Sequence, residues 1–272
     1  MKLYVGLFAT ALKHRELVWN FVRRDFRGRY LGSYLGFFWN VIQPVVLVTV
    51  YTFIFSQLMQ LKLGESGDTR LFAIYIFAGM VPWISFAEAL ARNTNCVLEH
   101  ANLIKKVAFP SEILCLSQAL YALVGQLFGL ATLIAAAVLL TDYVPDERLG
   151  VIVLLFALQL FFMLGVGYFL AALNVFVRDT QQFMSSFMIL WMLITPIFYD
   201  ERYIARVAPG LMYFNPQYYL VWCYRWCIYP RAALPAESIV RGLAIYAGIG
   251  LVVLFLGYNF YMHTKHRFAD EI

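Results

Sequence analysis

The sequence predicts an all-α, polytopic membrane protein with six transmembrane helices, an N-terminal amphipathic interface helix and re-entrant helices before the last span. The first observation is composition: 62% of the 272 residues are hydrophobic, 14% are charged, and the mean hydropathy is +0.70. A soluble domain carries about 25% charged residues, so most of this surface must face lipid. The second observation is that the apolar residues form long runs without alternation. Backbone groups in lipid must bond within their own segment, so these runs predict helices.

Six apolar segments are long enough, or nearly so, to cross the hydrocarbon core as helices of about 20 residues. The fifth is the shortest. Residues 35–272 are therefore the predicted transmembrane domain, and residues 1–34 form a separate cytoplasmic interface segment. The predicted spans are Leu35–Leu61, Leu71–Ala91, Ile113–Leu140, Leu149–Val177, Phe183–Tyr199 and Ile239–Met262.

The distribution of Lys and Arg predicts the orientation. With six spans, both termini lie on one side of the membrane. That side holds 13 of the 21 Lys and Arg residues, and seven of these precede the first span. Positive loops stay in the cytoplasm, so we expect both termini there. We expect no nucleic-acid partner, because the chain has no soluble basic domain to carry one.

A basic amphipathic helix is predicted over residues 13–27. Apolar residues from Leu17 to Phe26 share one face, and arginines occupy the rest. Such a helix lies among the lipid headgroups, as a topology anchor or as a docking element. The glycines that follow, Gly28, Gly32 and Gly36, are spaced four apart. That spacing indicates either a packing seam between helices or chance.

A second amphipathic helix is predicted at about 97–108, between spans two and three. Its apolar residues have helical spacing, Pro110 ends it, and Ser111 can cap the next helix. A short cytoplasmic helix between two spans suits contact with a soluble partner.

The region at about 200–236 differs from the spans. Its apolar run, Gln217–Tyr229, lies between two prolines, is interrupted by Arg225 and is too short to cross a membrane. It fits a re-entrant or interfacial helix. Aromatic residues are dense from Tyr199 to Tyr229. They indicate an aromatic belt at the interface, or for a few of them stacking on sugars.

The sequence lacks the common nucleotide-binding, hydrolase and metal-ligand motifs. It has no phosphate-cradling Gly-x4-Gly-Lys-Ser/Thr loop and no hydrolase motif, and its four histidines form no metal-ligand spacing. We therefore expect a protein that is not an enzyme and binds no cofactor of its own. Glu88 is the main charge inside a span. Arg92 lies four residues later and can pair with it, although a proton relay is the alternative.

Short stretches along nearly the whole chain resemble one family. They are Arg24–Ser33 followed by Leu35-Gly36 and Trp39, Gln43-Pro44, Val50–Ser56, Ala101–Pro110, Asn174–Asp179, Thr195-Pro196-Ile197, Asn215-Pro216 and Lys265–Ala269. Together and in order, they resemble the permeases of ATP-binding-cassette polysaccharide exporters of the O-antigen and teichoic-acid type.

The resemblance implies a homodimer in the bacterial inner membrane, bound to two copies of a cytoplasmic ATPase that carries ATP and Mg. It also implies a polysaccharide substrate built on undecaprenyl diphosphate, moved through a pore that spans one and five line. Aromatic faces in those spans could stack on sugars, and Arg pairs well with phosphate. The candidate residues are Tyr51, Phe55, Phe183, Phe187 and Trp191 for the channel; Arg24, Arg27 and Arg29 for the lipid-phosphate entrance; and Glu99, His100, Asn102, Lys105 and Lys106 for ATPase coupling.

Three alternatives stay open on the sequence alone. An exporter of drugs or small lipids would share the same architecture. A membrane enzyme acting on lipid-linked sugars would need a carboxylate pair or a His/Asp constellation facing the membrane, and none is evident. A secondary transporter would show inverted repeats and intramembrane charges, and we find no convincing repeat.

Overall fold

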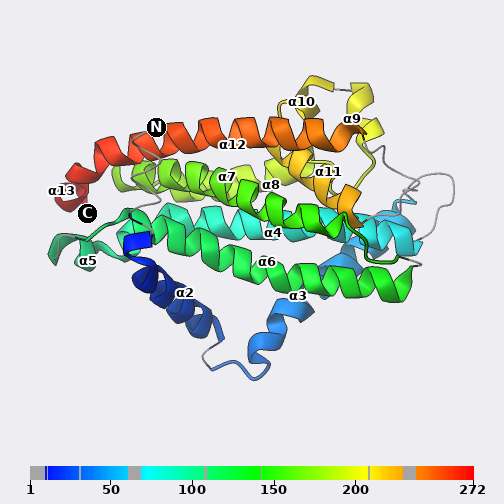
Figure 1. Ribbon diagram of the computed structural model, residues 1–272, viewed down its shortest axis with the longest axis horizontal. Helices are drawn as coiled ribbons and strands as arrows, with labels where there is room; N and C mark the ends of the chain where they lie inside the picture. Colours follow the sequence, from blue (N-terminus) through cyan, green and yellow to red (C-terminus); the bar gives the residue numbers. More distant parts are fainter. Residues whose placement is uncertain are drawn as a thin grey trace.

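Long helices lying side by side form the body of the protein (Figure 1). The computed structural model describes residues 10, 12–30, 32–60, 69–106, 109–141, 143–207, 209–228 and 237–272. Every regular element within these ranges is helical, which confirms the all-α prediction. The elements are α2 (Arg15–Tyr30), η1 (Gly36–Phe38), α3 (Trp39–Thr52), the π-helical η2 (Phe53–Leu58), α4 (Thr69–Glu99), α5 (Ala101–Lys106), α6 (Glu112–Leu140), α7 (Leu149–Phe176), α8 (Thr180–Ile194), α9 (Glu201–Val207), α10 (Pro209–Tyr213), α11 (Pro216–Ile228), α12 (Glu237–Thr264), η4 (Lys265–Arg267) and α13 (Phe268–Glu271).

Among the described residues, four helical stretches are long and apolar enough to cross a membrane: Thr69–Glu99, Glu112–Leu140, Leu149–Phe176 and Ile239–Glu271. The predicted first and fifth spans correspond to shorter helices, α3 and α8. Helix α8 ends at Ile194 because Thr195, which precedes Pro196, is extended (φ −77°, ψ 126°). The structure thus supports a multi-pass membrane protein, while the six-span count stays a prediction.

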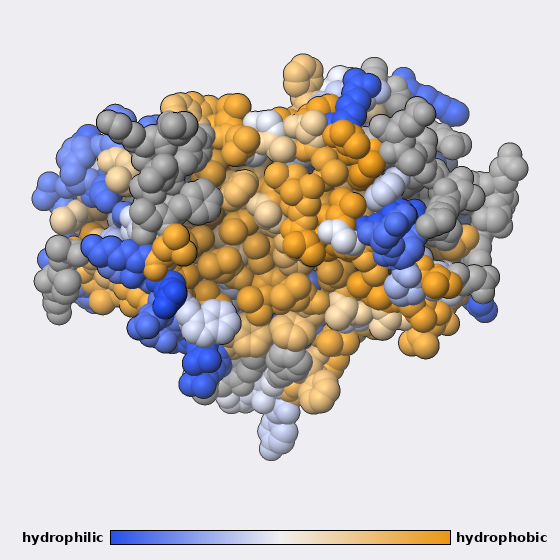
Figure 2. Space-filling view, viewed as in Figure 1, coloured by the Kyte–Doolittle hydropathy of each residue, from blue (hydrophilic) through white to orange (hydrophobic). Residues whose placement is uncertain are grey.

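Helix α4 is the centre of the bundle. It packs against α3, α6, α7, α8 and α11, and 72% of its apolar window is buried, against 28–39% in the other three long helices. Those three helices therefore keep apolar faces on the outside. In Figure 2 a broad apolar band crosses the middle of the molecule, with hydrophilic residues toward both ends, as expected for a protein surrounded by lipid.

The short helices gather at the two ends of the bundle (Figure 1). One end carries α2, α5 and α13, so the predicted interface helix, the predicted coupling region and the C-terminal segment share a side. The opposite end carries α9, α10 and α11, which occupy the predicted re-entrant region. Residues 229–236 of that region lie outside the described part, and its re-entrant character stays a prediction.

The structure explains the glycine series differently from a packing seam. Gly28 lies in α2, whereas Gly32 (φ +80°) lies between α2 and η1, and Gly36 (φ +45°) is the first residue of η1. The three therefore do not share a helix face, and no described atom lies within 4 Å of a Cβ built on any of them. The seam interpretation is wrong for this protein. Gly32 and Gly36 instead supply the left-handed backbone that the connection between α2 and α3 needs.

Candidate functional site

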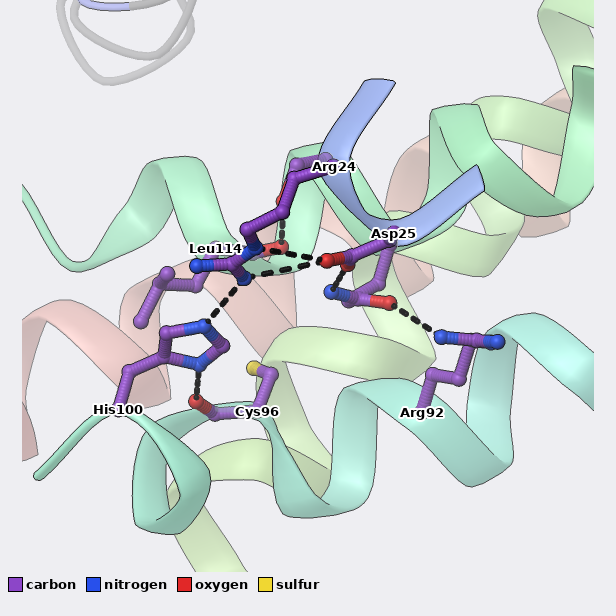
Figure 3. Close-up of polar contacts among 8 residues, drawn as sticks. Arg24, Asp25, Arg92, Cys96, His100 and Leu114 are labelled. Carbon is purple, nitrogen blue, oxygen red and sulfur yellow. Dashed lines mark hydrogen bonds and ion pairs between the residues drawn. The ribbon is translucent and has the colours of Figure 1, made fainter. Parts of the chain in front are cut away.

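Helix α2, the predicted interface helix, lies against the hairpin made by α4, α5 and α6 (Figure 3). Phe21 is buried, and its ring stands edge-on to His100 with 5.5 Å between centroids. Nη2 of Arg24 donates to Nε2 of His100 over 2.9 Å, while Nδ1 of His100 lies 2.9 Å from the carbonyl oxygen of Cys96. With its proton on Nδ1, the His100 ring accepts from Arg24 and donates to Cys96.

The next residue of α2 extends this contact to α6. Asp25 accepts a hydrogen bond from Nε of Arg24 at 3.1 Å and another from the Gln118 amide at 2.7 Å. The Gln118 carbonyl oxygen in turn lies 3.4 Å from Nη1 of Arg92 on α4. One turn of α2 is thereby joined to both arms of the hairpin.

Glu88 of α4 is shared by two guanidinium groups. Its Oε1 accepts from Nε of Arg92 at 3.3 Å, which confirms the predicted pair, and from Nη1 of Arg29 at 2.8 Å. Arg29 also donates to the Tyr121 hydroxyl at 3.1 Å, and the Arg92 guanidinium lies 4.0 Å from the Tyr121 ring centroid. The end of α2 is thus tied to α4 and α6 by paired charges around one tyrosine ring.

The predicted coupling residues differ in their surroundings. His100 faces α2, where it contacts Arg24, and it is half-buried. Lys105 donates to the backbone carbonyl oxygen of Ile272, so α5 also contacts the C-terminal segment. The side chain of Lys106 lies outside the described part. The exposed residues of the predicted set are Glu99, Asn102 and Lys105. Helix α5 itself covers Ala101–Lys106, and residues 97–99 belong to α4.

The predicted lipid-phosphate arginines also differ from one another. The Arg24 side chain is 56% exposed although it contacts Asp25 and His100. Arg27 is exposed on α2. Arg29 is 30% exposed and already paired with Glu88. Arg24 and Arg27 are therefore the more available cations of the three.

The predicted channel residues of α3 and η2 contact a residue that the sequence did not single out. The Tyr51 ring lies 4.7 Å from the Phe198 ring, and the Phe55 ring stacks on Phe198 at 5.0 Å with 9° between planes. Phe198 is buried, immediately after the break at Pro196. The Thr-Pro sequence at 195–196 marks this break, but nothing in the sequence pairs Phe198 with a residue almost 150 positions earlier.

The other predicted channel residues form a ladder along α8. Phe183 and Phe187 stack at 5.9 Å with 9° between planes, and Phe187 lies 5.5 Å from Trp191. Phe183 and Phe187 are 66% and 40% exposed, whereas the Trp191 indole N–H donates to Asn215 at 2.8 Å. The three rings line an apolar groove of about 410 Å³ between α7 and α8. Flat, exposed ring faces of this kind can bind a sliding ligand without fixed hydrogen bonds.

Arg225 of α11 is a buried residue whose role the sequence did not reveal. Its guanidinium donates to the carbonyl oxygens of Ile197 (2.8 Å) and Tyr75 (3.3 Å) and lies 3.3 Å from the Tyr75 ring centroid. The only signal was one charge within an apolar run. Arg225 ties α11 to α4 and to the chain after α8. Within the described ranges, no group of three or more His, Cys, Asp or Glu side chains could hold a metal ion.

Comparison with known proteins gives a consistent result. The ABC-2 type transporter family matches residues 16–229. The chain is 27% identical over 270 residues to the O-antigen export system permease protein RfbA of Myxococcus xanthus, covering 98% of this chain and 100% of that protein. It is also 26% and 24% identical to two proteins of the same name from Klebsiella pneumoniae, covering 91% of each chain in both cases.

Proposed function

Because this chain belongs to the ABC-2 type transporter family, we propose that it is the transmembrane permease that exports an undecaprenyl-diphosphate-linked polysaccharide across the inner membrane. The polysaccharide would be an O-antigen, a capsule or a teichoic acid. The observation that carries the proposal is the end-to-end match with an O-antigen export permease. The match favours polysaccharide over drugs or small lipids, and a permease over an enzyme.

In this proposal the permease works as a homodimer with two cytoplasmic ATPase subunits, which bind ATP and Mg. The sequence has no phosphate-cradling loop of its own. Helix α5 offers the ATPase an exposed surface at Asn102, Leu103 and Lys105. Both termini would lie in the cytoplasm with α5. Helices α2 and α13 lie at the same end of the bundle as α5, which supports this arrangement (Figure 1).

The lipid diphosphate would meet the exposed arginines of α2, Arg24 and Arg27, with Arg29 behind them. The glycan would slide along aromatic faces, and among the predicted channel residues Phe183 and Phe187 are the most exposed. Support comes from the stacked geometry of Phe183 and Phe187 on an open apolar groove. Stacking tolerates movement because it has little directional bonding to break.

The experiment is purification of the permease with and without its candidate ATPase, followed by deletion in cells. We expect the two chains to co-purify, the permease alone to hydrolyse no ATP, and deletion to leave the lipid-linked polysaccharide inside the cell. Normal surface polysaccharide in the deletion strain, or ATP hydrolysis by the permease alone, would contradict the proposal.

A further inference from the structure

Helix α2 is held to the α4–α5–α6 hairpin by side-chain contacts, whereas its link to α3 contains glycines. It is joined to the α4–α5–α6 hairpin by Arg24 with His100 and by Asp25 with Gln118. Its connection to α3 instead passes through Gly32 and through Gly36 at the start of η1, both with positive φ. Helix α2 can therefore move together with the hairpin while it pivots relative to α3 about the two glycines.

We propose that Arg24 and His100 lock the interface helix α2 to the turn before α5, so that α2 moves with α5 when the ATPase displaces α5. The backbone at Gly32 and Gly36 then rotates, and α2 changes its position relative to α3. This inference rests on the proposed function, since it requires a partner that pushes on α5. It assigns His100 a positioning role within the permease, because its ring faces α2 (Figure 3).

The contact at His100 is well defined on both sides. The ring is held to the end of α4 by the bond to the Cys96 carbonyl oxygen, and its other nitrogen accepts a hydrogen bond from Arg24. Phe21 closes the contact: the Arg24 guanidinium lies 4.7 Å from its ring centroid, and Phe109 packs edge-on to it at 6.1 Å. Polar bonds fix the register of α2 here, and the buried phenylalanine excludes water.

The chain that leads into α3, by contrast, is weakly packed. Tyr34, Leu35, Phe38 and Trp39 are all exposed, with Tyr34 fully so. The first buried residue of α3 is Asn40, and Val48 and Thr52 are buried further along the helix. Movement of α2 would therefore displace the exposed residues before Asn40 without breaking core contacts.

The first test is a double-mutant cycle on the assembled complex in vesicles, read as glycan exported per ATP hydrolysed. We expect Arg24→Ala and His100→Ala each to lower that ratio by about tenfold, and the double variant to be no lower than either single one. His100→Gln should recover much of the ratio, because its amide oxygen can accept from Arg24. Arg23→Ala is the matched control, since Arg23 is exposed and its guanidinium lies over Trp19 of its own helix.

The outcomes separate this inference from the proposed function. If Arg24 acts only by binding lipid phosphate, the effects of the two alanine substitutions on the export ratio will add, and His100→Gln will not restore the ratio. That result overturns the lock. A loss of protein with an unchanged ratio would show a purely structural contact and also overturns it. If the wild-type complex exports no glycan, the proposed function itself fails.

A second readout measures the movement directly. All four native cysteines are buried, so spin labels can be placed at the exposed positions Trp19, Leu103 and Val46. Between nucleotide-free and ATP-trapped states, we expect the 19–103 distance to stay constant and the 19–46 distance to shift. His100→Ala should broaden the 19–103 distribution. A 19–103 distance that shifts as much as the 19–46 distance would overturn the lock.

Discussion

Gly165 of α7 and Gly257 of α12 meet backbone to backbone, at the contact between the two helices. A Cβ on Gly257 would overlap the carbonyl oxygen of Gly165, and a Cβ on Gly165 would lie 2.5 Å from the Leu254 nitrogen. Small residues allow this close approach, and tight packing is a main source of helix association in lipid.

Replacing Gly257 with Ala should separate these helices. We expect a destabilisation of about 1–3 kcal/mol from overpacking, measured as a lower melting temperature of the purified permease. Gly248→Ala on the same helix is the control, because its Cβ would meet no described atom within 4 Å, and Ala favours helix over Gly. Equal melting temperatures for the two variants would mean that this close contact does not hold α7 and α12 together.

Removing the Glu88 carboxylate should leave two neighbouring cations without their shared partner. These side chains are 21–33% exposed, so solvent screening limits the effect to about 1–2 kcal/mol. We expect Glu88→Gln to lower the amount of folded permease in membranes, and addition of Arg92→Gln to restore part of it. The export rate per folded molecule should hardly change. Normal protein levels with abolished export would instead favour the proton-relay interpretation of Glu88.

Arg225 should tolerate no replacement that loses its fork of donors. Arg225→Lys places a single ammonium nitrogen where two guanidinium nitrogens, Nε and Nη2, each donate to a carbonyl oxygen, so the two bonds cannot both keep their geometry. We expect a loss of more than about 2 kcal/mol, seen as aggregation or low yield in detergent. Arg241→Lys, at an exposed position, should behave as wild type. A normal yield of Arg225→Lys would show that α11 is held by its apolar contacts alone.

The aromatic ladder on α8 should affect transport more than folding. Phe187→Ala removes the middle ring between Phe183 and Trp191, and because Phe187 is 40% exposed, we expect normal membrane levels. Export of glycan per assembled permease should fall several-fold, in line with about 1 kcal/mol for a lost stacking contact. Ile189→Ala, at a 61% exposed position of the same helix, is the control. Equal export by the two variants would remove the ladder from the proposed channel.

Features that depend on contacts between residues close in the sequence could be predicted from the sequence. The apolar runs predicted the long helices, and the spacing of Glu88 and Arg92 predicted their ion pair. Contacts between segments far apart in the sequence could not be predicted, because no local pattern marks them. Arg29 reaches Glu88 from 59 residues away, and no local pattern indicates it.

The reasons for the differences from the sequence predictions are physical. His100 was assigned to ATPase coupling because it lies between a span and a short amphipathic helix; its ring contacts Arg24 of α2, and its part in coupling stays a prediction. Gly28, Gly32 and Gly36 have the spacing of a helix seam, yet glycine also supplies positive φ, and spacing alone does not distinguish these uses. The predicted fifth span is shortened by its Pro196 break.

We propose that this chain, with an ATPase, moves lipid-linked polysaccharide across a membrane. The most direct measurement uses inverted membrane vesicles containing the permease and the ATPase, loaded on the outside with undecaprenyl-diphosphate-linked glycan. We expect added ATP and Mg to make the glycan inaccessible to an external glycosidase, and vesicles lacking the permease to show no such protection. Protection that is independent of ATP, or equal without the permease, would contradict it.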